Sequence, residues 1–303
     1  MSPNEDALAA RFDGHRERLI GVAYQLTGHL ADAEDAVQEA WLRLAHLDGT
    51  ARDEIHELGA WLTTVVGRIC LDRIRSAAAR RERYVGPWLA EPVVSEPDSE
   101  VPGPLETAVQ REDLRMAAMR VLHQLPPDQR LALVLHDAFD VPFADIAEML
   151  DCSVPAVRQH ASRGRRTVSN AGPPPRVPRA EHQRVLDEFL TAVSSGNVEA
   201  VVRVLHPQAV VYGDGGGKAR TALRAVVGGE KVAQFTLGLV TKYGEDLLTG
   251  IRPVLVNGDP GVLLPGTDTG QVAPRVMTLS VRDGRVAELF DVANPDKLTR
   301  IRF

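Results

Sequence analysis

Apolar residues recur at intervals of three and four positions along most of the first half of the chain, which predicts amphipathic helices. Three helices are expected in residues 8–80: one from about Leu8 to Tyr24, one over Ala31–Leu47 and one that begins near Leu58. A second helical block is expected from about Leu105 to Ser169. The first half of the chain is therefore predicted to be all-α.

The pattern changes after residue 180. Helical spacing returns at Val185–Val193, Asn197–Leu205 and Thr221–Tyr243. Between and after these helices come strand-like runs at Val210–Tyr212, Leu247–Val256, Gly261–Leu264, Val272–Val281 and Arg285–Val292. Asp283 and Gly284 separate the last two runs and predict a two-residue hairpin turn. Helices followed by an antiparallel meander predict an α+β domain with a curved sheet.

Two proline-rich segments divide the chain. Glu82–Pro104 is rich in proline, acidic and small residues and predicts a linker, except that the aromatic residues of Tyr84–Val93 need a surface to lie on. The successive prolines of Asn170–Arg179 exclude a helix. We predict helical domains over 8–80 and 109–170, a linker over 81–108 and an α+β domain over 180–303.

The stretch Phe143–Arg166 predicts a helix, a tight turn and a second helix, for which Ser153 is a suitable N-cap. An apolar stripe on the second helix is formed by Val154, Val157, Ala161, Gly164 and Val168. The opposite side carries Gln159, Ser162, Arg163 and Arg166, with Arg158 and Arg165 at its edges. Arginine and amide side chains bind phosphates and base edges, so a DNA-reading helix is predicted. The alternative is a solvated basic helix that packs on a core.

Charge is segregated along the chain. A hydrophobic content of 44% is ordinary for a globular protein, whereas the formal net charge of −6 does not fit a protein that coats nucleic acid without specificity. One basic run contains Arg73, Arg75, Arg80, Arg81 and Arg83, and a second extends from Arg158 to Arg179. The segment Glu91–Asp113 between them is acidic except for Arg111. Alternating blocks of charge predict two contacts with DNA and another partner between them.

The two cysteines, Cys70 and Cys152, are isolated in the sequence, so neither a disulfide framework nor a metal site is expected. The polar start of the chain and the lack of a long apolar run predict neither a leader peptide nor a membrane span. We therefore expect the protein in a reducing cytoplasm, away from membranes and without a cofactor.

Two parts of the chain resemble a known pair of domains. ADAEDAVQEAWLRL (Ala31–Leu44) followed by GAWLTTVVGRICLDRIRS (Gly59–Ser76) resembles region 2 of bacterial RNA polymerase sigma factors of the extracytoplasmic-function class. Residues Leu122–Val168 resemble region 4 of the same proteins. The resemblance implies a factor that binds core RNA polymerase, recognises the −10 and −35 elements of promoter DNA and initiates transcription.

The resemblance also implies roles for single residues. It implies that polymerase is bound by the acidic helix that carries Asp32, Asp35, Gln38 and Glu39. The −10 element would meet the helix that begins at Trp61, through Arg68 and through phosphate contacts of Arg73, Arg75, Arg80 and Arg81. The −35 element would meet Arg158, Gln159, Ser162, Arg163 and Arg166.

The last block resembles a SnoaL-like domain of the nuclear-transport-factor-2 fold. Its DGGGK (Asp214–Lys218) and NPDKL (Asn294–Leu298), together with GPWLAEP (Gly86–Pro92) in the linker, resemble marks of one sigma subgroup, although Ala90 replaces a proline of that pattern. The resemblance implies a regulatory domain that holds the two sigma domains in a given arrangement. The residues implied in regulation are Trp88, Asp214, Gly215, Gly216, Gly217, Lys218, Asn294, Pro295, Asp296 and Lys297.

Two alternatives to this function stay open, and a third is disfavoured. Related folds include isomerases and cyclases, for which His206, Asp214 and Asp291 are the candidate acid–base residues, and the pocket of the fold could bind an unknown small molecule. A ligand-responsive helix-turn-helix regulator would bind DNA by itself, normally as a dimer on a symmetric operator. A phosphate-binding role for DGGGK is disfavoured, because Ala219 follows Lys218 where a P-loop has serine or threonine.

Overall fold

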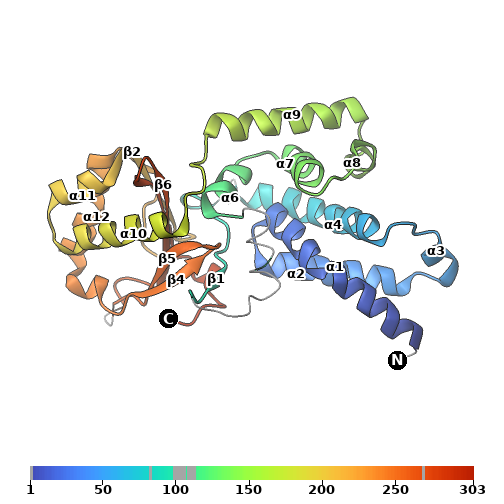
Figure 1. The fold of residues 1–303 in the computed structure, drawn as a ribbon, viewed down its shortest axis with the longest axis horizontal. Coiled ribbons are helices and arrows are strands. Elements are labelled where there is room, and N and C mark those ends of the chain that lie inside the picture. Colours follow the sequence, from blue (N-terminus) through green and yellow to red (C-terminus); the bar gives the residue numbers. More distant parts are fainter. Residues whose placement is uncertain (1–2, 82–83, 98–106, 108–113, 268–269) are drawn as a thin grey trace. The chain divides into compact units, whose positions relative to one another are not determined.

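The computed structural model describes residues 3–81, 84–97, 107, 114–267 and 270–303 (Figure 1). These residues form two compact units. The described parts of the first unit are residues 3–81, 107 and 121–172, and those of the second are residues 84–97, 114–120 and 173–303. The predicted fold class, two helical blocks followed by an α+β domain, is confirmed.

The first unit is helical. Its elements are α1 (Pro3–Thr27), α2 (Leu30–His46), α3 (Gly49–Asp53), α4 (Leu58–Arg81), α7 (Pro127–Leu133), the π-helical turn η1 (Val134–Ala138), α8 (Phe143–Leu150) and α9 (Val154–Ala171). Tyr24, Leu44 and Leu62 from three of these helices are fully buried, as the helical spacing predicts. Cys70 is buried with them, and burial raises the pKa of its thiol to about 12, which is the behaviour of a small core residue.

The two helical blocks of this unit pack against each other. The guanidinium of Arg130 on α7 is buried and donates to the carbonyl oxygens of Leu26 on α1, at 2.9 Å, and of Leu125, at 3.1 Å. On α4, a Cβ added to Gly67 would lie 3.0 Å from Leu135 of the second block. The absence of a side chain at Gly67 thus permits close approach of the two blocks.

The helix-turn-helix is formed as predicted. Asp151 ends α8 in the left-handed conformation, with φ of 51°. The hydroxyl of Ser153 then accepts a hydrogen bond from the amide of Ala156 and caps α9. Val157 and Ala161 are fully buried on the scaffold side of α9. The opposite face of this helix is therefore directed to solvent.

The second unit is built on one curved sheet. Its helical elements are α6 (Met116–Leu122, of which residues 116–120 lie in this unit), α10 (Arg179–Ser194), α11 (Val198–Val204), α12 (Gly229–Tyr243), η2 (Glu245–Leu248) and η3 (Pro295–Lys297). Its strands are β1 (Val94–Ser95), β2 (Leu205–Asp214), β3 (Val226–Val227), β4 (Arg252–Val256), β5 (Asp259–Leu264), β6 (Arg275–Arg282) and β7 (Arg285–Val292). They lie in the order β1-β4-β5-β6-β7-β2-β3, and all neighbours are antiparallel except β2 and β7.

The meander β4–β7 was expected, and its last turn has the predicted form. Asp283 and Gly284 both have positive φ, 53° and 67°, which is the conformation of a type I′ hairpin. One expectation is wrong: the helix predicted over Thr221–Tyr243 begins at Gly229. Gly228 has φ of +106°, which a helix excludes, and β3 pairs with β2 just before it.

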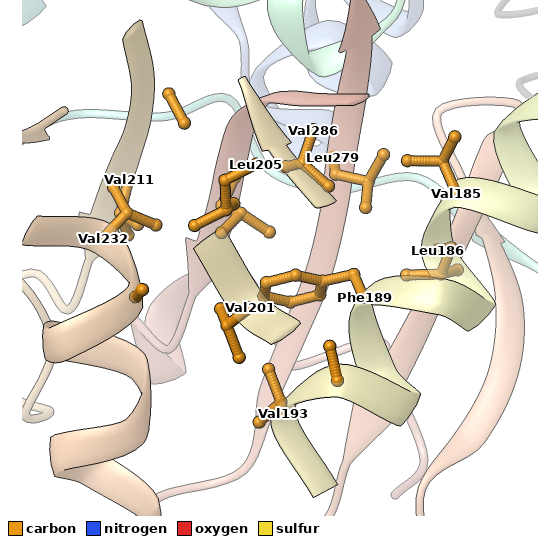
Figure 2. Packing of buried hydrophobic residues seen from close by; sticks show 14 of the residues in the cluster. Val185, Leu186, Phe189, Val193, Val201, Leu205, Val211, Val232, Leu279 and Val286 are labelled. Atoms are coloured by element: carbon orange, nitrogen blue, oxygen red, sulfur yellow. The ribbon is translucent and has the colours of Figure 1, made fainter. Parts of the chain in front are cut away.

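The sheet has an apolar core on each face. On the inner face, Phe189 of α10, Val201 of α11 and Val232 of α12 belong to one cluster (Figure 2). The strands add Leu205 of β2 and Leu279 of β6 to it. On the outer face, Phe290 and Val292 of β7 form a second cluster with Leu89, Met116 and Ala117. Residues 84–97 and 114–120 therefore cover the outer face, and β1 adds a strand to its edge.

His182 of α10 is a buried titratable group of this unit, 3% exposed. Its Nδ1 lies 4.0 Å from a carboxylate oxygen of Asp259. Burial, and then the positive charges of Arg115 and Arg176, lower the pKa of this imidazole from 6.5 to about 4. The folded state therefore holds His182 neutral at pH values where the unfolded chain protonates it.

We expect the second unit to lose stability as the pH falls from about 6.5 towards 4, because the unfolded state binds the proton more tightly there. The loss from this residue has an upper limit of about 3 kcal/mol. Scanning calorimetry of the full chain between neutral and mildly acidic pH measures it. His182→Gln should flatten the pH dependence of the melting temperature, whereas the exposed control His56→Gln should not. Equal slopes for wild type and H182Q would contradict the assignment.

Candidate functional site

The exposed face of α9 carries the side chains predicted to read DNA. Gln159, Ser162, Arg163 and Arg166 are exposed, and within the described residues none of them makes an ion pair. The edges of the helix are held to its scaffold. Arg158 lies over the ring of Phe143, 5.7 Å from its centroid, and Arg165 pairs with Asp137 through two hydrogen bonds of 2.5 and 2.7 Å. The Asp137 carboxylate raises the pKa of Arg165. The four central residues therefore form a pre-oriented polar face.

The acidic face of α2 is partly neutralised from within the unit. Arg73 of α4 donates to the carbonyl oxygen of Asp32 at 2.9 Å, and its guanidinium lies 3.5 to 3.9 Å from the carboxylates of Asp32, Asp35 and Glu39. Arg73 was expected to bind DNA phosphates, but here it pairs with the acids expected to bind polymerase. The sequence does not reveal this pairing, because the partners lie about forty positions apart.

A hollow lies beside this face, between α1 and α2. It has a volume of about 620 Å³ and is lined by residues that include Phe12, Asp35, Gln38 and Trp41. The Phe12 and Trp41 rings are 5.1 Å apart. Aromatic side chains bordered by acidic and amide groups form a surface suited to a protein partner with basic residues.

The arginines of α4 face the second helical block. Arg75 pairs with Asp128 of α7 at 3.1 Å, and Arg68 lies 3.6 Å from Glu148 of α8. These pairs are half-exposed, so each contributes about 1 kcal/mol or less. Arg68 and Arg75, two of the residues predicted for the −10 element, are thus engaged within the unit by weak pairs. The side chains of Arg80 and Arg81, at the end of α4, lie outside the described residues.

Asp214 is the centre of a buried cluster in the second unit. It is fully buried at the end of β2, and its Oδ2 accepts from the amide of Leu89 and from Nζ of Lys297, both at 2.8 Å. Its Oδ1 accepts from the hydroxyl of Tyr84 and from the amide of Gly216. The hydroxyl of Tyr84 stays protonated, because burial and the adjacent carboxylate raise its pKa. One carboxylate thus joins β2, the linker and the C-terminal segment.

Lys297 and Asn294 complete this cluster. Nζ of Lys297 is buried, donates to the carbonyl oxygen of Leu89 and lies 4.2 Å from the ring centroid of Trp88. The amide of Asn294 donates to the hydroxyl of Tyr84 at 2.8 Å, and its oxygen caps the turn η3. We call Tyr84, Trp88, Leu89, Asp214, Asn294 and Lys297 the linker lock.

The glycines of DGGGK allow this packing. A Cβ on Gly215 would lie 2.2 Å from the carbonyl oxygen of Ala219, and Gly216 has φ of +59° with Asn294 directly against it. Lys218 closes the loop by an exposed pair with Asp296, at 2.6 Å, just after Pro295. Because the Asp214 carboxylate already accepts from the Gly216 amide, this turn is not a phosphate cradle.

Asn257, which the sequence analysis did not single out, holds two segments of the second unit. It is 1% exposed, and its side-chain amide donates to the carbonyl oxygen of Leu114 at 2.7 Å while its oxygen accepts from the amide of Val93 at 3.0 Å. Arg120 forms a further buried pair with Glu288 at 2.7 Å. Residues 84–97 and 114–120 both belong to the connection between α4 and α7. Both segments are thus fixed to the same sheet. In the sequence, only its place before Gly258 indicates a turn, and the structure gives Asn257 the positive φ of such a turn, 51°.

The candidate acid–base residues do not converge. Asp214 belongs to the linker lock, whereas Asp291 lies on the inner face of the sheet and pairs with Arg275 at 3.0 Å. His206 lies 3.8 Å from the exposed carboxylate of Asp283. In the part of the chain that the structure describes, no His, Cys, Asp and Glu side chains gather as a metal site requires. The same residues contain no helix long and apolar enough to cross a membrane.

We expect Lys297→Met to destabilise the second unit by about 3–5 kcal/mol, because it leaves the buried Asp214 carboxylate without its cation. Native-state hydrogen exchange of amides in β6 and β7 of the full chain measures this unit by itself. The double change Asp214→Asn with Lys297→Met should recover part of the loss. Lys218→Met, which breaks an exposed pair, is the matched control and should cost about 1 kcal/mol or less. Equal losses for K297M and K218M would refute the role of the buried pair.

Comparison with known proteins identifies the family of the chain. Residues 12–80 match Sigma-70 region 2, and residues 115–168 match Sigma-70 region 4. The chain is 48% identical to the ECF RNA polymerase sigma factor SigJ of Mycobacterium tuberculosis, over 96% of this chain and 93% of SigJ. It is 30% identical to the probable ECF RNA polymerase sigma factor SigI of the same organism, over 98% of this chain and 97% of SigI.

Comparison of structures gives the same result. The crystal structure of the extracytoplasmic function sigma factor SigJ of Mycobacterium tuberculosis aligns with a TM-score of 0.80 at 47% identity, over 96% of this chain and 98% of that one. The two helical blocks, their order and the α+β unit that follows them are therefore shared along nearly the whole length. The chain belongs to the extracytoplasmic-function sigma factors of RNA polymerase.

Proposed function

We propose that α9 reads the −35 element, that α4 meets the −10 element and that α2 with the adjacent hollow binds core RNA polymerase. The exposed face of α9 supports this assignment most directly, because Arg163 and Arg166 are oriented outward while the edges of the helix are fixed. Arginine reads guanine through two hydrogen bonds in the major groove. Since polymerase and promoter DNA are the partners, we place this activity in the cytoplasm.

The contacts of α4 support a closed resting arrangement. Arg68 and Arg75 point to Glu148 and Asp128, so the surface proposed for the −10 element faces the block that carries α9. Two DNA readers that pack against each other cannot reach two separated promoter elements at once. Core polymerase would therefore have to separate the two blocks. The weak ion pairs of Arg68 and Arg75 would then be replaced by contacts with phosphates of the promoter DNA.

The linker lock provides control over this opening. The chain between α4 and α7 is held on the second unit by Asp214 at one end and by Asn257 and Arg120 at the other. A connection that is held at both ends limits how far apart the two helical blocks can move. We infer that the lock restrains the opening of the two blocks and that the second unit regulates initiation without catalysing a reaction. Sigma factors, the family of this chain, act by binding rather than by bond chemistry.

Arg163→Ala together with Arg166→Ala should lower run-off transcription by at least about tenfold, because each contact to a base contributes roughly 1–3 kcal/mol. Binding to purified core polymerase should be unchanged, since the acidic face of α2 is untouched. Arg184→Ala, an exposed arginine of α10 that pairs with Glu188, is the matched control. Wild-type transcription by the double variant would exclude α9 as the reader.

Trp88→Ala should raise run-off transcription severalfold, because it removes the ring that covers Lys297 and weakens the hold on the linker. Tyr84→Phe deletes the hydroxyl that donates to Asp214 and accepts from Asn294 but keeps the ring, so it should act in the same direction to a smaller extent. Tyr212→Phe lies on the same face of the sheet without contact to Asp214 and is the control. Unchanged or reduced output from both lock variants, at wild-type core binding, would reject the proposed restraint.

A further inference from the structure

An apolar cavity lies in the second unit, between the inner face of the sheet and helices α10 and α12. Its volume is about 650 Å³, which is within the range of small-molecule sites. Its wall is formed mainly by apolar side chains, among them Phe189, Leu190, Phe235, Leu239, Leu248 and Leu264. A cavity of this size and lining favours a ligand with an apolar body.

A polar group lies in the wall of the cavity. Oδ2 of Asp291 accepts from the hydroxyl of Thr221 at 2.6 Å and from Nη1 of Arg275 at 3.0 Å. The other oxygen of this carboxylate, Oδ1, has no hydrogen-bond partner in the part of the chain that the structure describes. A buried acceptor without a donor is costly. The carboxylate thus has unused capacity for a hydroxyl group.

The rim of the cavity is basic. Lys218, Arg220 and Lys242 contribute to the lining, and Lys218 is paired with Asp296. Arg220 and Lys242 have no acidic partner among the side chains that the structure describes, and Arg220 lowers the pKa of the neighbouring Tyr243 through a hydrogen bond. Two cations at the mouth that no described acidic side chain neutralises favour an anionic group on the ligand.

The linker reaches the same cavity. Val85, between Tyr84 and Trp88 of the lock, is part of its lining, together with Gly217 and Lys218 of DGGGK. A Cβ added to Gly217 would lie 3.3 Å from the side chain of Val85. A molecule in the cavity would therefore touch the linker as well as the sheet.

We propose that this cavity binds an aliphatic carboxylic acid with a terminal hydroxyl group. The carboxylate lies at Arg220 and Lys242, the hydrocarbon chain lies along the apolar wall, and the hydroxyl donates to Asp291. Binding adds contacts to Val85 and so stabilises the linker in its place. This inference concerns binding and does not depend on the promoter contacts proposed above.

Calorimetric titration of the full chain with ω-hydroxylaurate tests the proposal. We expect saturable binding to one site, with laurate, which lacks the hydroxyl, weaker by about tenfold because the Asp291 contact is lost. Lauryl alcohol lacks the carboxylate, so it should also bind about tenfold more weakly than ω-hydroxylaurate. Equal affinity for all three compounds, or no binding, would overturn the proposed ligand class.

Two variants locate the site. Leu239→Trp fills the cavity from a half-buried position of α12 and should abolish binding, whereas Val198→Trp, at an exposed position outside the cavity, should not. Hydrogen exchange of residues 84–90 should slow when ω-hydroxylaurate binds to the wild type and remain unchanged with L239W. Binding that survives L239W would place the ligand elsewhere, and binding without slower exchange would reject the contact with the linker. Because neither readout uses transcription, failure here is distinguishable from failure of the proposed promoter contacts.

Discussion

A single buried ion pair, Asp214 with Lys297, organises the second unit around the linker. A carboxylate taken out of water is expensive unless it is paired and its remaining acceptor sites are filled. Here the filling groups come from two segments: the linker supplies the amide of Leu89 and the hydroxyl of Tyr84, and the adjacent turn supplies the amide of Gly216. The cost of leaving Asp214 unpaired therefore helps to keep the linker in place, together with the hydrogen bond from Val93 to Asn257. The glycines of the adjacent turn let these groups come close enough.

The curved sheet serves different purposes on its two faces. Its outer face, with Phe290 and Val292, holds the chain that connects the two helical blocks. Its inner face encloses the apolar cavity, with Asp291 in the wall. Because side chains alternate along a strand, neighbouring residues of β7 belong to different faces. Asp291, which lines the cavity, and Val292, which packs against the linker side of the sheet, are therefore consecutive residues of the same strand.

Much of this arrangement could be predicted from the sequence, where local signals were strong. Ser153 with the stripe Val157–Ala161 determined the second helix of the helix-turn-helix, and Asp283-Gly284 determined the last hairpin. The importance of DGGGK and NPDKL came from the resemblance to a sigma subgroup, and nothing in their spacing indicated that Asp214 and Lys297 meet. Their regulatory role stays a prediction.

Other features could not be predicted, because they depend on contacts between distant residues. Arg73 has an acidic neighbour in sequence, Asp72, yet its partners lie on α2. Asn257 reads as an ordinary turn residue, and its two hydrogen bonds join it to Val93 and Leu114, more than 140 positions away. Periodicity shows which face of a helix is apolar, but it does not show which distant polar group completes a buried network.

The strand β1 and the residues Leu89, Met116 and Ala117 belong to the chain before α7, yet they complete the sheet and its outer core. A fragment that starts at Ala180 would leave the edge of β4 unpaired and the apolar side chains of β7 in water, both of which promote association between molecules. The fold of the C-terminal unit therefore includes residues that precede residue 180 in the sequence. The smallest piece of the C-terminal half that can stand by itself includes the connecting segments, so the fusion of this unit to the sigma blocks is part of its own architecture rather than an attachment.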